Sequence, residues 1–325
     1  MRVINYFDSD KQDHWLSEIK RADWDAARFL YELLSKGTFF DATGKHSKVM
    51  MLTDGDELIS FCTYAEKDDI QPTELTPWMG FVYTFPEYRG HHYCGRLMEE
   101  IERLAKKDGV SELYISTNHT GLYEKYGCEF KTDMNDMHGE PSRVYAKKIP
   151  DDELLIELSD MEWPLEYIDH DRRIARAIVF DGGGNYYFVR AERDDDFGKA
   201  TLIETSGGGV ESGEDLYTAI KRELKEELGV EVEAVCKIGT VVDYYNLIHR
   251  RNLNNYFLCK IVSFGEKHLT RDEIEDFHLS TLKLTYEEAI KEYENRRETR
   301  LGRLISNREL PILKKAHEII NRGSL

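Results

Sequence analysis

Short strand-like runs of apolar residues alternate with longer stretches whose apolar residues recur at helical spacing, in both halves of the chain. Such runs predict β-strands, and the longer stretches predict amphipathic helices. In the first half we expect strands at residues 3–7, 48–52, 58–64, 78–85, 113–116 and 143–147, and helices at 23–35 and 94–107. The Asp-Gly-Asp turn at residues 54–56 joins two of these strands and indicates a hairpin.

The second half repeats this mixture. We expect strands at residues 174–180, 186–190, 201–205, 231–238 and 255–262, an edge strand at 154–158, and helices at 214–228, 286–296 and 309–321. The DGGGN turn at residues 181–185 indicates a second hairpin, and the glycines at 207–209 are expected to form a loop. Strands and helices mixed in both halves predict an α/β (α+β) fold.

The length of the chain indicates two domains. A chain of 325 residues is too long for one ordinary core and fits two domains of about 150 residues each. The acidic segment at residues 149–162 is the expected boundary region. We therefore expect one domain at residues 1–150 and a second at residues 151–325. A hydrophobic content of 41% favours globular folding for both.

The charge and the cysteines narrow the class of protein. A formal net charge of -18 argues against general nucleic-acid binding. The five cysteines are widely spaced and form no C-x-x-C pair, as expected for reduced thiols in a cytoplasmic protein. The chain starts without a signal-peptide pattern, and no apolar run approaches the roughly 20 residues of a membrane span, so we expect no membrane contact. The sequence leaves open whether the chain forms a homo-oligomer.

Residues 208–230 carry the clearest chemistry, because acidic residues on a predicted helix follow a glycine cluster. At about 100° per residue, the apolar stripe of this helix consists of Leu216, Ile220, Leu224 and Leu228. Glu223 and Glu227 project toward the same inward side, and Glu226 lies at its margin. Carboxylates four residues apart repel each other, and burial raises that cost unless a cation compensates. The alternative is a solvated acidic helix in which Arg222 and Glu226 form an i,i+4 ion pair.

These residues resemble the Nudix signature G-x5-E-x7-R-E-U-x-E-E-x-G-U, in which U is aliphatic, at every fixed position. The resemblance extends more loosely over residues 172–321 and implies a C-terminal α/β/α sandwich. It implies Glu226 and Glu227 as the main metal ligands and Glu223 as a further ligand or base. It also implies coordination by the carbonyl of Gly208, orientation of the glutamates by Arg222, and a loop held by Glu214.

The Nudix resemblance implies hydrolysis of a pyrophosphate bond in a small-molecule nucleoside diphosphate derivative. Mg²⁺ or Mn²⁺ suits a site of carboxylate and carbonyl oxygens. A bound metal lowers the pKa of a coordinated water and neutralises phosphate charge, and a carboxylate can take the proton. The acids at 272, 273 and 275 (Asp272, Glu273 and Glu275) are candidates for an extra ligand or base, with solvated loop acids as the alternative.

Substrate choice is less visible in the sequence. Residues 244–246 (YYN) and 249–251 (HRR) follow the signature closely. Their aromatic rings suit stacking on a base and their arginines suit clamping a phosphate. Packing of the tyrosines at the end of a strand is the alternative.

In the first half, a strand, a turn and a loop lead directly into a helix within residues 80–98. Backbone amides at the amino terminus of a helix attract anions such as the pyrophosphate of coenzyme A. The segment resembles the R/Q-x-x-G-x-G/A motif of the GNAT acetyltransferase family, although His92 stands where that family has a glycine and a cysteine stands at the Gly/Ala position. The resemblance implies acetyl-CoA as cofactor, bound by Arg89, Gly90, His91, Tyr93, Cys94, Gly95 and Asn118.

Residues 118–130 (NHTGLYEKYGCEF) resemble a second GNAT segment, N-x-x-A-x-x-L-Y-E-K-x-G-F, in slightly shortened form. This resemblance implies that Tyr123 is the general acid for the departing thiolate, since a phenol with a pKa near about 10 matches a thiolate in basicity. Packing of Tyr123 in a short helix is the alternative. The resemblance also implies an amine acceptor and a mixed sheet with helices over residues 1–148. No general base stands out.

The sequence therefore predicts a two-domain enzyme, a metal-dependent Nudix hydrolase fused to a GNAT-like, acetyl-CoA-dependent N-acetyltransferase. The alternative is a regulatory protein that binds a nucleotide or an acyl-CoA without turnover, with a degenerate acetyltransferase domain. The departure at His92 motivates that alternative. A third hypothesis makes acetyl transfer the principal activity.

Overall fold

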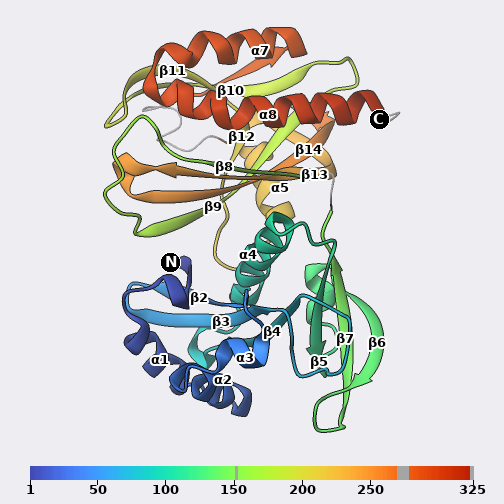
Figure 1. The fold of residues 1–325 in the computed structure, drawn as a ribbon. Helices are drawn as coiled ribbons and strands as arrows, with labels where there is room; N and C mark the ends of the chain where they lie inside the picture. The colour runs from blue at the N-terminus through green and yellow to red at the C-terminus, as the bar shows by residue number, and fades with distance from the viewer. Residues whose placement is uncertain (151–152, 269–277, 323–325) are drawn as a thin grey trace. The chain divides into compact units, whose positions relative to one another are not determined.

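The structure is a computed structural model that describes residues 1–150, 153–268 and 278–322 (Figure 1). The chain divides into two compact units, Met1–Asp151 and Asp152–Leu325. Each unit has its own sheet and its own buried apolar clusters. The two units are therefore described one after the other.

The first unit is built on a seven-stranded sheet in the order β1-β2-β3-β4-β5-β7-β6. Its strands are β1 (Arg2–Asn5), β2 (Lys48–Asp54), β3 (Glu57–Ala65), β4 (Trp78–Thr84), β5 (Glu112–Thr117), β6 (Glu129–Asn135) and β7 (Pro141–Lys148). The pair of β4 and β5 is parallel and the other neighbours are antiparallel, so the sheet is mixed, as predicted.

Helices cover both faces of this sheet because alternate residues of its strands are apolar on both sides (Figure 1). Val49 and Met51 of β2 pack in one cluster with α1 (Gln12–Lys20), α2 (Asp25–Ser35) and α3 (Phe39–Thr43). Met50 and Leu52 pack in the opposite cluster with α4 (Tyr93–Lys107). The strand β4 therefore runs between two helical layers and leads through the short helix η2 (Pro86–Tyr88) toward α4.

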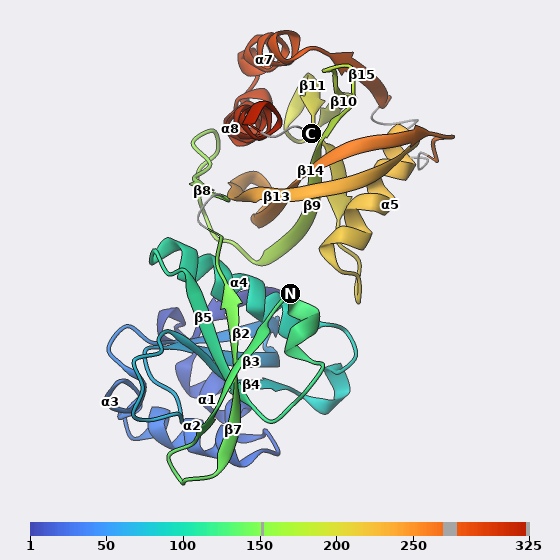
Figure 2. The ribbon, with the colours of Figure 1, turned by 90° about the vertical axis from the view of Figure 1, so that its right-hand side faces the viewer.

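The second unit is built on an eight-stranded sheet in which β11-β10-β9-β14-β13-β8 are neighbours, β12 pairs with β9 and β15 pairs with β10 (Figure 2). Its strands are β8 (Leu154–Leu158), β9 (His170–Phe180), β10 (Tyr186–Asp195), β11 (Gly198–Glu204), β12 (Ser206–Gly209), β13 (Val230–Tyr245), β14 (Arg250–Phe264) and β15 (Ser280–Leu284). The predicted edge strand at residues 154–158 is confirmed, since β8 pairs only with β13 among the described strands.

Three layers form the second unit, again because its strands are apolar on both faces. Ala175, Ala177 and Val179 of β9 pack with α5 (Leu216–Leu228). Ile178 and Phe180 of the same strand pack on the other face with α7 (Tyr286–Asn295) and α8 (Arg300–Arg322). The arrangement is the α/β/α sandwich that the sequence predicted.

Several predicted elements were wrong in position or missing. The helix α1 was not predicted because Trp15, Leu16 and Ile19 are its few apolar residues. Strand β1 ends at Asn5, and the predicted end of that strand belongs to the short helix η1 (Tyr6–Asp8). Helix α8 begins well before residue 309. Strands β13 and β14 extend beyond their predicted ends because they continue through buried polar residues, which interrupt the apolar pattern: Asp243, Asn252 and Asn254.

The glycine cluster, predicted as a loop, is the strand β12, which pairs with β9. Gly207 has a φ of +140°, and a Cβ atom at this residue would lie 2.2 Å from the carbonyl oxygen of Ala175 on β9. The missing side chain lets the two backbones approach each other closely. The glycines therefore serve sheet formation directly.

Two further features concern the whole chain. Within the described ranges, no helix combines the length and the apolar character that crossing a bilayer requires. The cysteines are free thiols, and Cys62, Cys128 and Cys259 are buried.

Replacing Gly207 with alanine is expected to destabilise the second unit by roughly 2 kcal/mol or more, because the Cβ clashes with the β9 backbone. Hydrogen exchange of the β9 and β12 amides measures this effect in that unit alone. Gly182→Ala is the matched control, since a Cβ atom there meets nothing within 4 Å and the φ is ordinary. Equal exchange protection in the two variants would contradict the assignment of Gly207.

Candidate functional site

The helix α5 carries the acidic residues that the sequence singled out, and its two ends are defined by local chemistry. The Asp215 side chain accepts hydrogen bonds from the backbone amides of Tyr217 and Thr218 and caps the amino terminus. Gly229 adopts a left-handed conformation, with a φ of 66°, and ends the helix. The caps fix where the helix begins and ends, and packing of its apolar stripe, with Ile220 and Leu224 at the centre, sets its rotational phase against the sheet.

That phase turns two glutamates inward, as the helical wheel predicted. Glu223 and Glu227 are each 9% exposed, whereas the side chain of Glu226 is 37% exposed. The inward pair lies against β12 rather than against an apolar surface. The two carboxylates therefore meet backbone and hydroxyl groups, which solvate them in place of water.

Glu227 is the more strongly held of the two inward acids. Its Oε2 atom accepts a hydrogen bond of 2.5 Å from Ser206 Oγ and one of 3.0 Å from the backbone amide of Gly207. Burial raises the pKa of Glu227 to about 7, although these two hydrogen bonds oppose the shift and Glu223 adds to it. A neighbouring cation would favour the charged form of this carboxyl.

Glu223 lies directly against the next residue of the strand. A Cβ atom at Gly208 would lie 2.5 Å from Oε1 of Glu223, so a side chain at that position would displace the Glu223 carboxylate. The missing side chain of Gly208 thus leaves room for the Glu223 carboxylate beside β12.

Arg222 joins the glutamates of the helix to one another. Its Nε and Nη2 atoms donate to the two oxygens of Glu214 at 3.0 and 2.9 Å. Its Nη1 atom donates to Glu223 at 2.8 Å and to Glu226 at 3.3 Å, and Nη2 also donates to the carbonyl of Gly209 at 3.2 Å. These contacts, led by the hydrogen bond to Glu214, raise the pKa of Arg222. The same pair lowers the pKa of Glu214.

The side chains of this site fit a hard divalent cation by their chemistry. Three carboxylates and the carbonyl of Gly208 supply oxygen atoms, which Mg²⁺ and Mn²⁺ prefer. In the part of the chain that the structure describes, no three His, Cys, Asp or Glu side chains are arranged to hold a metal ion. Glu223 and Glu226 instead bind Arg222, and bringing them onto one ion requires them to turn away from its Nη1 atom.

The downstream candidates have different outcomes. Asp272, Glu273 and Glu275 lie outside the described residues. The packing alternative holds for Tyr245 and Asn246, which are buried.

Arg251 forms two hydrogen bonds of 2.8 Å with Asp171, and the His249 ring stacks on Tyr167. Arg250 alone among these arginines has no carboxylate partner in the described structure.

In the first unit, the predicted cofactor-binding residues gather around the start of α4. His92 caps this helix in a left-handed conformation with a φ of 56°. Arg89, Gly90 and His91 precede it and are exposed, and Arg89 Nε donates to the carbonyl of Thr84. Tyr93 and Cys94 begin the helix and are half-buried, with the Tyr93 ring stacked on His91. Asn118 is exposed directly after β5.

Gly95 lies in a different environment from the other members of this group. It is buried, and a Cβ atom there would lie 2.8 Å from Cε1 of Tyr126. Tyr126 belongs to the short helix η3 (Tyr123–Tyr126). The glycine therefore lets η3 pack against the first turn of α4, a reason that its motif position did not suggest.

Tyr123, the predicted general acid, is 5% exposed in the apolar cluster beneath α4. Burial raises its pKa well above the usual range, with further contributions from the Cys94 and Cys62 thiols. The phenol is therefore protonated at every physiological pH. Burial also raises the pKa of Cys94, to about 12. The proximity of Tyr123 to Cys94 brings the second GNAT-like segment against the first.

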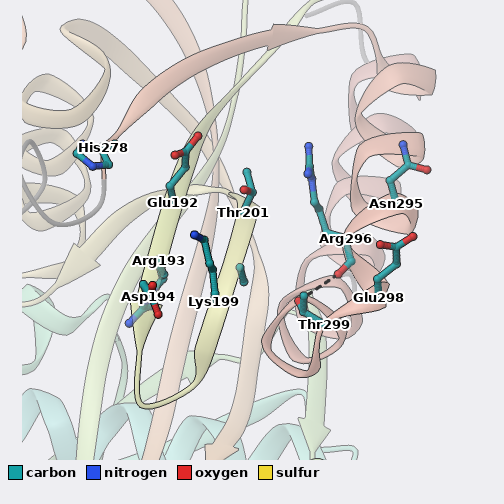
Figure 3. Close-up of a pocket in the computed structure, with 11 residues that line it drawn as sticks. Glu192, Arg193, Asp194, Lys199, Thr201, His278, Asn295, Arg296, Glu298 and Thr299 are labelled. Atoms are coloured by element: carbon teal, nitrogen blue, oxygen red, sulfur yellow. Dashed lines mark hydrogen bonds between the residues drawn. The ribbon is translucent and has the colours of Figure 1, made fainter.

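A cavity of about 470 Å³ lies elsewhere in the second unit, between the hairpin of β10 and β11 and the segment that follows α7 (Figure 3). It is lined mainly by charged and polar side chains, among them Lys199, Arg296 and Glu298. None of its lining residues belongs to the α5 site. The site on α5 and β12 is thus distinct from this cavity.

The sequence analysis did not identify three residues that hold the α5 site in place. Ser206 was not singled out, although its hydroxyl binds Glu227. Thr205 and Glu309 were also missed, and the Glu309 carboxylate accepts hydrogen bonds from the backbone amide and hydroxyl of Thr205 at 2.7 and 3.0 Å. No local pattern links residues that lie about a hundred positions apart in the chain.

Two family models match the chain. The model described as "NUDIX domain" matches residues 170–300, and the one described as "Acetyltransferase (GNAT) family" matches residues 10–128. The chain joins a GNAT domain to a Nudix domain. The predicted assignments of the two halves to these families are confirmed.

Individual relatives are more distant. The protein named uncharacterized Nudix hydrolase YfcD, from Salmonella typhi, is 29% identical to this chain over 126 residues. That match covers 39% of this chain and 65% of the relative, just under two thirds of its length.

Solved structures resemble each domain separately. A NUDIX hydrolase from Nitrosomonas europaea has 17% identity and a TM-score of 0.36, and covers 45% of this chain and 88% of its own. The aminoglycoside 6'-N-acetyltransferase from Enterococcus faecium has 15% identity and a TM-score of 0.34, and covers 46% of this chain and 98% of its own. The family assignment rests on the two models and not on these likenesses.

The raised pKa of Glu227 predicts how metal-free stability depends on pH. Between about pH 4.5 and about pH 7 the native state holds a proton that the unfolded chain has lost, so stability falls as the pH rises through this window. Glu227→Gln cannot ionise, so the stability of this variant does not fall with pH through the window. Relative to wild type, the variant should gain roughly 1–3 kcal/mol of stability between about pH 5 and about pH 8.

Urea denaturation in EDTA measures this difference, with hydrogen exchange of the β9 and β12 amides as the probe of the Nudix domain. Glu231→Gln removes one negative charge from a glutamate whose side chain is 60% exposed and controls for the change in net charge. A stability difference between Glu227→Gln and wild type that stays constant with pH would contradict the raised pKa.

Proposed function

We propose that the Nudix domain is a metal-dependent pyrophosphohydrolase that cleaves a pyrophosphate bond in a small-molecule nucleoside diphosphate derivative. The observation that carries the proposal is the contact between the acids of α5 and the glycine strand β12. Glu223 lies against Gly208, and Glu227 accepts a hydrogen bond from the amide of Gly207, so two carboxylates meet the glycine strand where we expect a cation to bind. Mg²⁺ or Mn²⁺ is the cofactor that this chemistry favours.

Each residue of the site then has a defined task. Glu226, Glu227 and the carbonyl of Gly208 would hold the ion, and Glu223 would hold it or accept the proton of the attacking water on a carboxylate oxygen. Arg222 holds Glu223 and Glu226 beside the site before they turn onto the ion. Its hydrogen bonds to Glu214 and to the carbonyl of Gly209 would keep it in place when they do. The bound metal supplies charge neutralisation of the pyrophosphate and a lowered pKa for the attacking water.

Hydrolysis is tested by incubating the protein and its variants with Mg²⁺ or Mn²⁺ and a panel of nucleotide pyrophosphates, with identification of the products. Glu226→Gln and Glu227→Gln are expected to lose roughly 100-fold or more in turnover, and Arg222→Lys roughly 10- to 100-fold, because Arg222 acts through the ligands. Glu231→Gln is the matched control and should keep full activity. A wild-type protein that hydrolyses no member of the panel would refute the proposal.

For the first domain we propose acetyl transfer from acetyl-CoA to an amine. The support is geometric. The start of α4 is preceded by Gly90, which has a φ of +86° and no neighbour within 4 Å of its Cβ position, so a phosphate can approach this backbone. Arg89 is exposed beside it. We place the domain boundary near residue 150. The family matches do not favour the regulatory alternative.

Tyr123→Phe tests the acid role in acetyl transfer. Removing the hydroxyl is expected to lower turnover by roughly 100-fold, since the departing thiolate loses its proton donor. Release of coenzyme A thiol with a panel of amines measures the effect. Tyr126→Phe, on the same short helix, is the matched control and should retain activity. Full activity of Tyr123→Phe would leave Tyr123 with a packing role alone.

A further inference from the structure

One face of the Nudix sheet carries polar residues where the neighbouring positions are apolar. Strands β9 and β14 are parallel, and Arg172 pairs in register with Asn252, and Ile174 with Asn254. Paired residues of parallel strands share a face of the sheet. Arg250 lies two residues before Asn252, so it belongs to the same face. Two arginines from two strands therefore stand on one surface.

These two arginines differ from the other arginines of this region. Arg176 lies within 4 Å of the carboxylates of Glu204 and Glu309, and Arg251 binds Asp171. In the ranges that the structure describes, neither Arg172 nor Arg250 forms a salt bridge. Burial lowers the pKa of Arg250 to about 10, and repulsion by Arg172 adds to the effect. Two like charges are thus held near each other, with no carboxylate of the described residues within salt-bridge distance of either. The more distant carboxylates of Glu223 and Asp243 still favour the charged forms of Arg172 and Arg250, respectively.

Several polar atoms of the same region are buried and lack a hydrogen-bond partner within the described protein. They are Nε of Arg250, Oδ1 of Asn252 and Nε of Arg308. Asn252 and Arg308 are each 1% exposed. An unsatisfied buried polar group costs free energy, so a ligand that satisfies these atoms binds favourably there. Two of the three atoms are cationic donors, which favours an anionic ligand.

The arginines lie next to the proposed catalytic site. The Nε and Nη2 atoms of Arg172 are 3.6 Å from the position of a Cβ atom at Gly209. Gly208, the preceding residue of β12, contacts Glu223 in the same way. Two consecutive glycines thus separate the acids of α5 from the guanidinium of Arg172. Successive residues of a strand face opposite sides of a sheet, so Glu223 and Arg172 lie on either side of β12, near enough for the Glu223 carboxylate to act on the pKa of Arg172. Among the described strands β12 pairs only with β9, so a substrate that passes its free edge would contact both groups.

We infer that Arg172 and Arg250 form an anion-binding subsite that receives a phosphate group of the hydrolase substrate beside the metal-binding acids. The inference rests on the proposed hydrolase function. It specifies the substrate as a compound with two neighbouring phosphates, one bound by the arginines and the other acted on by the metal. Guanidinium groups suit this task because each presents several N–H donors in a planar fork that matches phosphate oxygens. The subsite is a local cationic surface in a chain of net charge -18.

Calorimetric titration of the full-length chain with inorganic pyrophosphate in EDTA tests this subsite. Without divalent ions, the acids of α5 repel the probe, so binding reports the arginines. Arg172→Gln and Arg250→Gln are each expected to weaken binding about tenfold or more, because each removes charge-assisted hydrogen bonds to phosphate. Arg297→Gln is the matched control, since Arg297 is paired with Glu294, and it should bind pyrophosphate like wild type.

Equal affinity of wild type and both variants overturns the inference, as does absence of wild-type binding at millimolar pyrophosphate. Saturable binding of an uncharged nucleoside in place of pyrophosphate, lost in Arg172→Gln, would assign the arginines to base recognition and contradict the inference as well. Circular dichroism verifies the fold of Arg250→Gln. If Arg250→Gln does not fold, Arg172→Gln alone decides the test, because Arg172 is exposed and its replacement leaves the core intact.

The same proteins separate this inference from the hydrolase proposal. Pyrophosphate binding in EDTA that depends on both arginines, with no hydrolysis of any nucleotide when Mg²⁺ is added, would refute the hydrolase and keep the subsite. If Glu226→Gln loses hydrolysis and Arg172→Gln hydrolyses the substrate with the KM of wild type, the hydrolase proposal stands and the arginine subsite is refuted.

Discussion

The contact between helix α5 and strand β12 is the constraint on which the Nudix domain depends. Two glutamates of the helix lie against consecutive glycines of the strand. A side chain at Gly207 would clash with the β9 backbone, and one at Gly208 would displace the Glu223 carboxylate. Burial of carboxylates is costly, and here the hydroxyl of Ser206 and the amide of Gly207 offset part of that cost for Glu227. A divalent cation would offset the rest, which is the physical reason to regard the site as a metal site.

The strand is also held from the opposite face of the sheet. Glu309 of α8, which is 0% exposed, accepts hydrogen bonds from the amide and hydroxyl of Thr205, the residue before β12. Burial opposes ionisation of Glu309, but Arg308 and Arg176 keep its pKa below the ordinary value. Thr205 is thus fixed by a buried ionic network, and the hydroxyl of its neighbour Ser206 donates a hydrogen bond to Glu227 of α5. Helices on both faces of the sheet therefore set the position of one short strand.

Features that depend on residues close together in the chain could be predicted from the sequence. Features that depend on the register of paired strands could not. The phase of α5 followed from helical periodicity, and it correctly turned Glu223 and Glu227 inward. The conversion of the glycine cluster into a strand did not follow, because it depends on pairing with β9. The proximity of Arg172 to Arg250 depends on the register of two strands far apart in sequence. Gly95 shows the same limit within the GNAT domain, since its contact with Tyr126 joins two separate motifs.

Crystals of the protein soaked in Mn²⁺ test the central claim most directly, since anomalous scattering locates the ion without any assumption about the substrate. The account predicts an anomalous peak bonded to the carboxylates of Glu226 and Glu227, with the carbonyl of Gly208 nearby and the hydrogen bond from Arg222 to Glu226 broken. No peak at this position, with Arg222 still bonded to both Glu223 and Glu226, would contradict it.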